Sequence, residues 1–268
     1  MSASAIAVTD PAWNSVFTPA GEKTVMPVPR ALEAAEIPGI VEAFAQGARN
    51  AMAAGFDGVE VHAANGYLIQ QFLNDSSNTR ADAYGGSVEN RARLCLEVMD
   101  AVVAAVGDSR KVGIRVGPYN FFLSCTDSNP AATYGYLVPE LSKRKLGYLH
   151  LITPRQFEGA TESDPSLAPF RAAFDGTVIL AGGFERASGA KALAAGEGDA
   201  IAYGRWYLAN PDLPKRFALN AELNAYDRDA FYNPMMPIKG CVKPGGIEGM
   251  HVFGAGVLTR ARVASQLH

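Results

Sequence analysis

The sequence predicts an α/β fold of the TIM (β/α)8-barrel type, present here as a partial barrel. Short apolar segments recur along the chain, amphipathic helical patterns lie between them, and glycine or polar side chains follow several of the apolar segments. This alternation is typical of a parallel sheet covered by helices, and polar strand ends match the face on which barrels bind their ligands. Five strands are predicted, at residues 57–62, 111–117, 147–152, 177–182 and 199–204.

Helical periodicity fills the intervals between these strands. In residues 88–106 the apolar side chains Val88, Leu94, Val98 and Val102 recur at helical spacing. Residues 37–54 carry a similar apolar stripe ahead of the first strand. Helices are therefore predicted at residues 37–54, 88–106, 131–143, 187–195 and 212–219.

Two of the predicted strands separate an apolar face from a polar one. Gly113 and Arg115 share a face in one strand, and Glu60 and His62 share a face in the other. We expect the apolar side chains to face the outer helices and the polar ones to face the barrel interior. An inward Arg115 costs free energy without an anionic partner. Its partner is either a bound ligand with electron-rich atoms or a carboxylate in a salt bridge, such as that of Glu60.

The last part of the chain is expected to form a tail of unrecognised type at residues 233–268, after a barrel domain at residues 1–232. Five strands cannot close an eight-stranded barrel, so the sheet is expected to keep unpaired edges. Residues 251–259 are a candidate strand weakened by glycine, and residues 258–267 are a candidate short helix. The prolines and glycines of the tail fit a loop equally well.

Composition excludes several classes of function. Of the 268 residues, 48% are hydrophobic and 19% are charged, which is typical of a globular protein. The net charge of −3 gives no reason to expect nucleic acid or an acidic membrane as a partner. The sequence shows no secretory signal and no long apolar run, and Cys95, Cys125 and Cys241 lack metal-ligand spacing. We therefore expect a soluble, cytoplasmic protein without a metal site, and we leave homo-oligomer formation open.

Three polar side chains lie at the end of the first predicted strand: His62 ends the strand, and Asn65 and Tyr67 follow in the loop. In a barrel this loop lies on the C-terminal face of the sheet, where catalytic groups are found. The imidazole and carboxamide N–H groups could both hydrogen-bond one carbonyl or phenolate oxygen, and Tyr67 could deliver a proton nearby. A single histidine at a strand end is more often a core residue, so the case for catalysis depends on the surrounding sequence.

From about residue 5 to residue 232 the sequence resembles the old yellow enzyme family, the FMN-dependent ene-reductases that include the oxophytodienoate reductases. The similarity extends over many separate blocks in the same order, which makes it specific. These blocks are residues 17–21, 27–30, 55–86, 113–116, 181–184, 202–205, 208–213 and 226–232.

The resemblance implies FMN as the cofactor, NAD(P)H as the reductant and an α,β-unsaturated carbonyl compound as the substrate. His62 and Asn65 would then hold the substrate oxygen, and Tyr67 would protonate the α-carbon of the alkene. Arg115 would lie against the pyrimidine edge of the flavin. Tyr232 matches an aromatic residue that covers the substrate pocket, although ordinary apolar packing would also account for it.

The resemblance also identifies the last two predicted strands as the seventh and eighth of the family barrel, after which barrels commonly bind phosphate. Gly182 and Gly183 end one of them, and Gly204 and Arg205 end the other. Glycine pairs most often mark tight turns, but their occurrence at two successive strand ends is more specific. No G-x-G-x-x-G dinucleotide fingerprint is present.

Family members begin with three further strands that no block of this sequence matches, on the order of a hundred residues in a barrel of about 250. Relatives use residues of those strands to hold the flavin ring. The sequence therefore leaves a second hypothesis open, a truncated and non-catalytic relative that cannot hold FMN unaided. A third hypothesis, a different FMN barrel enzyme, is disfavoured by the spacing of His62, Asn65 and Tyr67.

Overall fold

The computed structural model of this 268-residue chain describes residues 1–18, 22–154, 165–228, 231 and 256–259. Its centre is a six-stranded sheet in the order β3-β4-β5-β6-β7-β8, in which β3 to β7 are parallel. These five strands confirm the predicted ones and their predicted arrangement. They are β3 (Val59–Ala63), β4 (Val112–Val116), β5 (Tyr148–Ile152), β6 (Thr177–Ala181) and β7 (Ala200–Tyr203).

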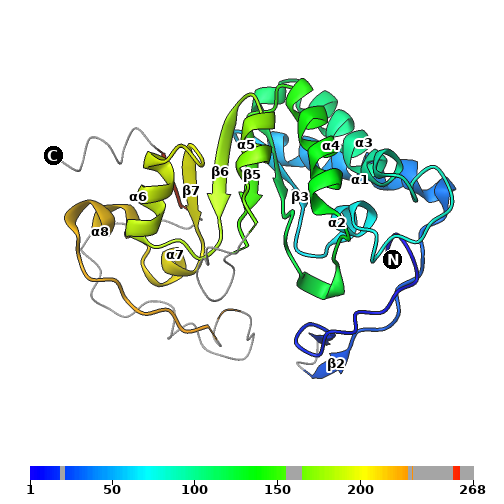
Figure 1. Cartoon of the computed structure of the whole chain (residues 1–268), viewed down its shortest axis with the longest axis horizontal. Helices are drawn as coiled ribbons and strands as arrows, with labels where there is room; N and C mark the ends of the chain where they lie inside the picture. The colour runs from blue at the N-terminus through cyan, green and yellow to red at the C-terminus, as the bar shows by residue number, and fades with distance from the viewer. Residues whose placement is uncertain (19–21, 155–164, 229–230, 232–255, 260–268) are drawn as a thin grey trace.

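The five predicted helices are present with ends within one residue of the predicted ones. Figure 1 shows α1, α3 and α4 together beside β3, and α6 with α8 beside β7. Helix α3 has clear end signals: the Ser87 hydroxyl accepts from the Asn90 N–H, and Gly107 follows at φ +79°. The helices are α1 (Ile37–Ala53), α3 (Val88–Val106), α4 (Pro130–Lys143), α6 (Arg186–Ala194) and α8 (Leu213–Leu219).

Several short elements were not predicted, because they lie in segments that show no clear helical or strand period in the sequence. An antiparallel pair, β1 and β2, lies on the side toward which the arrows of β5 and β6 point in Figure 1. The short elements are β1 (Ser15–Phe17), β2 (Lys23–Val25), α2 (Leu68–Leu73), α5 (Ala168–Ala173), α7 (Arg205–Ala209) and the 3-10 turns η1 (Ala34–Glu36), η2 (Ser109–Lys111) and η3 (Phe122–Ser124).

The two faces of the sheet differ as the strand alternation predicts. Val61 and Ile114 belong to the buried hydrophobic core that the helices cover. On the opposite face, the register aligns His62 with Arg115, and Arg115 with His150. The inner face of the partial barrel therefore carries a row of polar side chains across β3, β4 and β5.

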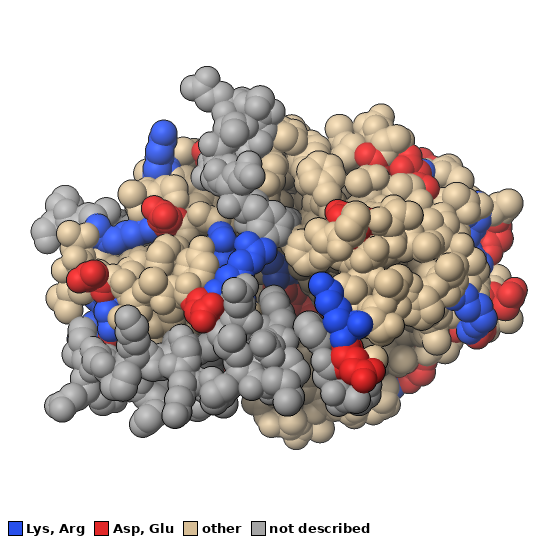
Figure 2. Space-filling model, turned by 90° about the horizontal axis from the view of Figure 1, so that it is seen from below, with Lys and Arg blue, Asp and Glu red and all other residues tan. Residues whose placement is uncertain are grey.

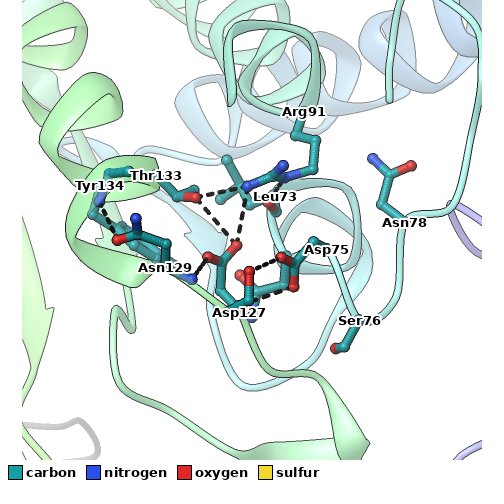
Figure 3. A network of polar contacts seen from close by, with 12 residues as sticks. Leu73, Asp75, Ser76, Asn78, Arg91, Asp127, Asn129, Thr133 and Tyr134 are labelled. Atoms are coloured by element: carbon teal, nitrogen blue, oxygen red, sulfur yellow. Dashed lines mark hydrogen bonds and ion pairs between the residues drawn. The ribbon is translucent and has the colours of Figure 1, made fainter. Parts of the chain in front are cut away.

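A buried ion pair joins α3 to the loop that precedes α4 (Figure 3). The Arg91 guanidinium lies 3.3 Å from the Asp127 carboxylate, and the side chains of these two residues are 9% and 0% exposed. Arg91 also donates to the carbonyl oxygen of Leu73, at 2.7 Å, and to the Thr133 hydroxyl, at 2.9 Å. These contacts fix the end of α2 and the start of α4 against α3.

The sheet ends differ from each other. Strand β8 (Gly256–Thr259) runs antiparallel to β7 and lies inside the candidate strand at residues 251–259. Residues 258 and 259 are therefore strand and not part of a helix, and the remainder of the two candidate elements lies outside the described residues. At the other end, no described strand pairs with the outer edge of β3. Among the described residues, no helix has the length and apolar character needed to span a membrane.

Candidate active site

A pocket of about 260 Å³ opens at the carboxyl ends of β4 to β7. Figure 2 views this side of the molecule and shows Lys and Arg side chains near its middle, beside a depression. Two arginines and no acidic residue are found among the described residues that line the pocket, so it suits an anionic ligand. The lining residues are Asn65, Arg115, Phe122, Ile152, Ala181, Gly182, Gly183, Phe184, Ala202, Tyr203, Gly204, Arg205 and Trp206.

Arg115 reaches the pocket from β4, on the predicted inner face. Its Nε atom is buried and has no hydrogen-bond partner among the described residues. Burial lowers the pKa of the guanidinium, while the charge of Glu60 opposes that shift. Glu60 does not form the suggested salt bridge with Arg115; its carboxylate lies 2.9 Å from Nδ1 of His150 instead.

The two glycine-ended strands converge on the same pocket. Gly182 and Gly183 follow β6 with φ values of +131° and +67°. Residues that carry a Cβ atom rarely adopt these backbone conformations. A Cβ atom at Gly182 would also lie 2.3 Å from the Thr153 hydroxyl oxygen. Gly204 and Arg205 follow β7. The Arg205 guanidinium lies over the ring of Tyr226, 5.5 Å from its centroid, which holds the charge at the side of the pocket.

Strand β3 and the loop after it place the three candidate catalytic side chains in two different surroundings. Asn65 lines the pocket described above. His62 lines a second cavity of about 520 Å³ between β3 and α1, and no described strand pairs with the outer edge of β3. The Tyr67 side chain is exposed, and its ring centroid lies 5.5 Å from that of His62. The structure therefore joins Asn65 to the arginines and glycines. It also places His62 beside Arg115 in the strand register, with the Tyr67 ring close to the His62 ring.

Burial and the charge of Arg115 lower the pKa of His62 below its ordinary value. The carboxylate of Glu60 opposes this effect but does not cancel it. The lowered pKa favours the neutral imidazole at pH 7, which still has one N–H group that can donate to a carbonyl oxygen.

Sequence reasoning missed two polar residues around the site. His150 is buried, and among the described residues its Nε2 atom has no hydrogen-bond partner. Strand alternation within residues 147–152 was the signal that could have placed it on the inner face. Asn120, from the loop after β4, donates from Nδ2 to Oδ1 of Asn65 at 2.6 Å. Its position past a strand end was the only signal for it.

Two further site predictions concern features beyond this pocket. Tyr232 lies outside the described residues. Within the described residues, no group of three or more His, Cys, Asp or Glu side chains could hold a metal ion.

Comparison with known proteins places this geometry in a family. Residues 3–224 match the model of the NADH:flavin oxidoreductase / NADH oxidase family. 12-Oxophytodienoate reductase 1 of Oryza sativa subsp. japonica is 51% identical over 219 residues, which are 81% of this chain and 57% of that protein. 12-Oxophytodienoate reductase 2 of Arabidopsis thaliana is 52% identical over 206 residues, 76% of this chain and 55% of that protein.

A solved structure of morphinone reductase in complex with tetrahydroNAD is 43% identical and superposes with a TM-score of 0.76. The superposition covers 85% of this chain and 61% of that one. The chain thus spans somewhat more than half the length of the relatives it matches. The family match, the sequence identity and the shared α/β-barrel architecture together show that the chain belongs to the NADH:flavin oxidoreductase / NADH oxidase family, as a member of the old yellow enzyme type whose family cofactor is FMN.

Proposed function

We propose that the protein is an FMN-dependent ene-reductase that uses NAD(P)H to reduce the alkene of α,β-unsaturated carbonyl compounds. The observation that carries this proposal is the pocket that joins Asn65 to Arg115, Arg205 and the two glycine-ended strands. These residues come from four strand ends and supply hydrogen-bond donors and positive charge. FMN and a carbonyl substrate are both recognised through electron-rich oxygen and nitrogen atoms.

The residues present fit part of an FMN molecule. Arg115 has a buried Nε–H without a described acceptor, which the electron-rich pyrimidine edge of a flavin would supply. Gly182, Gly183 and Gly204 allow a phosphate to approach the backbone, and Arg205 adds a charged donor. The volume of about 260 Å³ is below the roughly 300–1,000 Å³ of pockets that enclose a whole drug-sized ligand. The pocket therefore suits a portion of FMN and not all of it.

The loop after β3 would bind the substrate. In this proposal His62 and Asn65 donate hydrogen bonds to the carbonyl oxygen and stabilise the negative charge that develops on it, an effect worth a few kcal/mol per well-placed donor. FMN, when bound, supplies the hydride that adds to the β-carbon. The exposed Tyr67 hydroxyl protonates the α-carbon, and its contact with the His62 ring keeps the two groups on one side of the substrate.

Three finer assignments also remain part of the proposal. Residues 1–232 would form the FMN-binding unit and residues 233–268 a separate tail. Tyr232 would cover the substrate. The protein would act in the cytoplasm.

A second candidate function is a non-catalytic relative that holds FMN only with the help of another polypeptide. The observation that favours it is the outer edge of β3, which pairs with no described strand and borders the cavity lined by His62. An open edge of this kind leaves backbone N–H and C=O groups available for another strand.

Turnover in the presence of excess FMN separates the two candidates. The 268-residue protein, with FMN and NADPH or NADH, should oxidise the nicotinamide in a manner that depends on 2-cyclohexenone and should form cyclohexanone. The double variant His62→Ala and Asn65→Ala is the control, and it should lose the enone-dependent rate. No cyclohexanone from well-folded protein would reject catalysis by this chain and favour the second candidate.

A further inference from the structure

Asn120 lies where the loop after β4 meets the loop after β3. Asn120 is only 4% exposed, although it belongs to a loop beside the pocket. A buried carboxamide needs hydrogen-bond partners on both its oxygen and its nitrogen. Both partners of Asn120 are present, and together they determine which way its amide group points.

The orientation is set by a backbone N–H group, which can only donate. The N–H of Phe122 donates to Oδ1 of Asn120 at 3.1 Å. The nitrogen of the Asn120 amide is therefore the atom that faces Asn65, and it donates to Oδ1 of Asn65 at 2.6 Å. The carbonyl oxygen of Asn65 is thus occupied, and its Nδ2 atom, a donor only, is the end that is left for a ligand.

We propose that Asn120 is a positioning residue that fixes the amide of Asn65 so that its Nδ2–H groups, and not its Oδ1 atom, face the ligand. The proposal rests on the proposed function, in which Asn65 donates to the oxygen of a carbonyl or phenolate. Without this constraint an asparagine side chain can present either its donor or its acceptor by rotation about its last torsion. An acceptor in that place would repel the electron-rich oxygen of the substrate.

The backbone around Asn65 holds the pair together. Asn65 and Gly66 have φ values of +57° and +72°, a left-handed turn that directs the Asn65 side chain toward the loop after β4. The fit between the loops is close, because a Cβ atom at Gly66 would lie 2.5 Å from the carbonyl oxygen of Phe122.

The Gln70 side chain also connects the loop after β3 to the loop after β4. This side chain is fully buried; it accepts from the Gly66 N–H at 2.8 Å and donates to the Gly117 carbonyl oxygen at 2.9 Å. The loops are therefore registered against each other independently of Asn120, and a substitution of Asn120 should change the amide orientation more than the loop position.

Asn120→Asp is the decisive variant. The carboxylate keeps an acceptor for the Phe122 N–H but has no proton to donate to Asn65. The Asn65 amide should then rotate, donate to the carboxylate and present Oδ1 to the ligand. With excess FMN, binding of 4-nitrophenolate should weaken at least about tenfold, in line with the loss of one charge-assisted hydrogen bond. Asn129→Asp, the same change at a residue that caps α4, is the matched control and should bind the probe normally.

A second measurement needs no FMN, and its first part uses the unmodified protein alone. In ¹H–¹⁵N NMR spectra the Nδ2 protons of Asn120 should exchange slowly with water and those of Asn65 rapidly. In Asn120→Asp the Asn65 protons should become the protected ones. Protected Asn65 amide protons in the unmodified protein would overturn the proposed orientation.

The outcomes also distinguish this proposal from the function on which it rests. If Asn65→Ala leaves 4-nitrophenolate binding unchanged, the proposed role of Asn65 in the reaction is wrong. If Asn65→Ala weakens binding while Asn120→Asp does not, Asn65 binds the ligand but Asn120 does not position it.

Discussion

At the residue scale, His62 combines two properties: its pKa is lower than that of an ordinary imidazole, and its ring is subject to opposing charges from Arg115 and Glu60. Its pKa is lowered from 6.5 by burial and by Arg115, and Glu60 acts in the opposite direction. The folded protein binds a proton at His62 less readily than the unfolded chain does. The contribution of the neutral His62 side chain to the free energy of unfolding is therefore fully present above pH 6.5. It is lost as the pH falls through the folded-state pKa.

We expect NMR titration of the His62 ring to give a midpoint below 6.5. Arg115→Gln should raise that midpoint, since it removes a positive neighbour, and Glu60→Gln should lower it further. The opposite signs of the two shifts are the internal control. A midpoint at or above 6.5 in the unmodified protein would show that the imidazole is not desolvated in this way.

Tyr67 is predicted to act only in the step that needs a proton. Tyr67→Phe should slow reduction of the alkene by about 10²-fold or more, which is typical for loss of a general acid. It should leave reduction of the flavin by nicotinamide nearly unchanged. Stopped-flow measurement of the two half-reactions checks this, with Tyr136→Phe, at a half-buried tyrosine outside the pocket, as the control. Equal losses in both half-reactions would contradict the assignment.

At the scale of elements, the Arg91–Asp127 pair connects α2, α3 and the start of α4. Asp127→Ala would leave the Arg91 charge buried without its partner, which typically costs roughly 3–5 kcal/mol. The matched control is Asp100→Ala, which removes the carboxylate from a more exposed pair with Arg144 and should cost no more than about 1 kcal/mol. Urea denaturation gives both free energies of unfolding. Similar values for the two variants would show that the buried pair does not secure these helices.

The sequence predicted long elements well and short ones poorly. Helix α3 has 19 residues of regular apolar spacing, a Ser87 cap and a terminal Gly107, so its limits could be read directly. Helices α2 and α7 have six and five residues, and their positions depend on tertiary contacts that no local pattern encodes.

The residues of the candidate site also fall into those that the sequence could predict and those that it could not. Strand ends marked Arg115, Gly182 and Gly204 as neighbours, because parallel strands bring their carboxyl ends to one edge. The contact between Asn65 and Asn120 could not be predicted, since these residues are 55 positions apart and meet through two irregular loops. Nor did the sequence show that His62 would line a cavity separate from the one that holds Asn65.

For the whole molecule, the outer edge of β3, with which no described strand pairs, is the feature that we expect to affect cofactor binding most. In the proposed site the pocket would hold only part of FMN, and phosphate contacts in a site open to water are partly screened by salt. We therefore expect the 268-residue chain to bind FMN more weakly than a complete barrel of the family. The segment of morphinone reductase that this chain does not match, added as a fusion or as a separate polypeptide, should tighten FMN binding. A scrambled segment is the control, and equal effects of the two would contradict a role for the β3 edge.

The central claim is that the pocket at the ends of β4 to β7 recognises the phosphate of FMN. Fluorescence titration of FMN and of riboflavin against the same protein tests it most directly. FMN should bind at least about tenfold more tightly than riboflavin, and Arg205→Gln should remove most of that preference, because each charge-assisted hydrogen bond contributes roughly 1.5–3 kcal/mol. Equal affinity for FMN and riboflavin, or a preference that survives Arg205→Gln, would contradict the assignment of this pocket as the phosphate site.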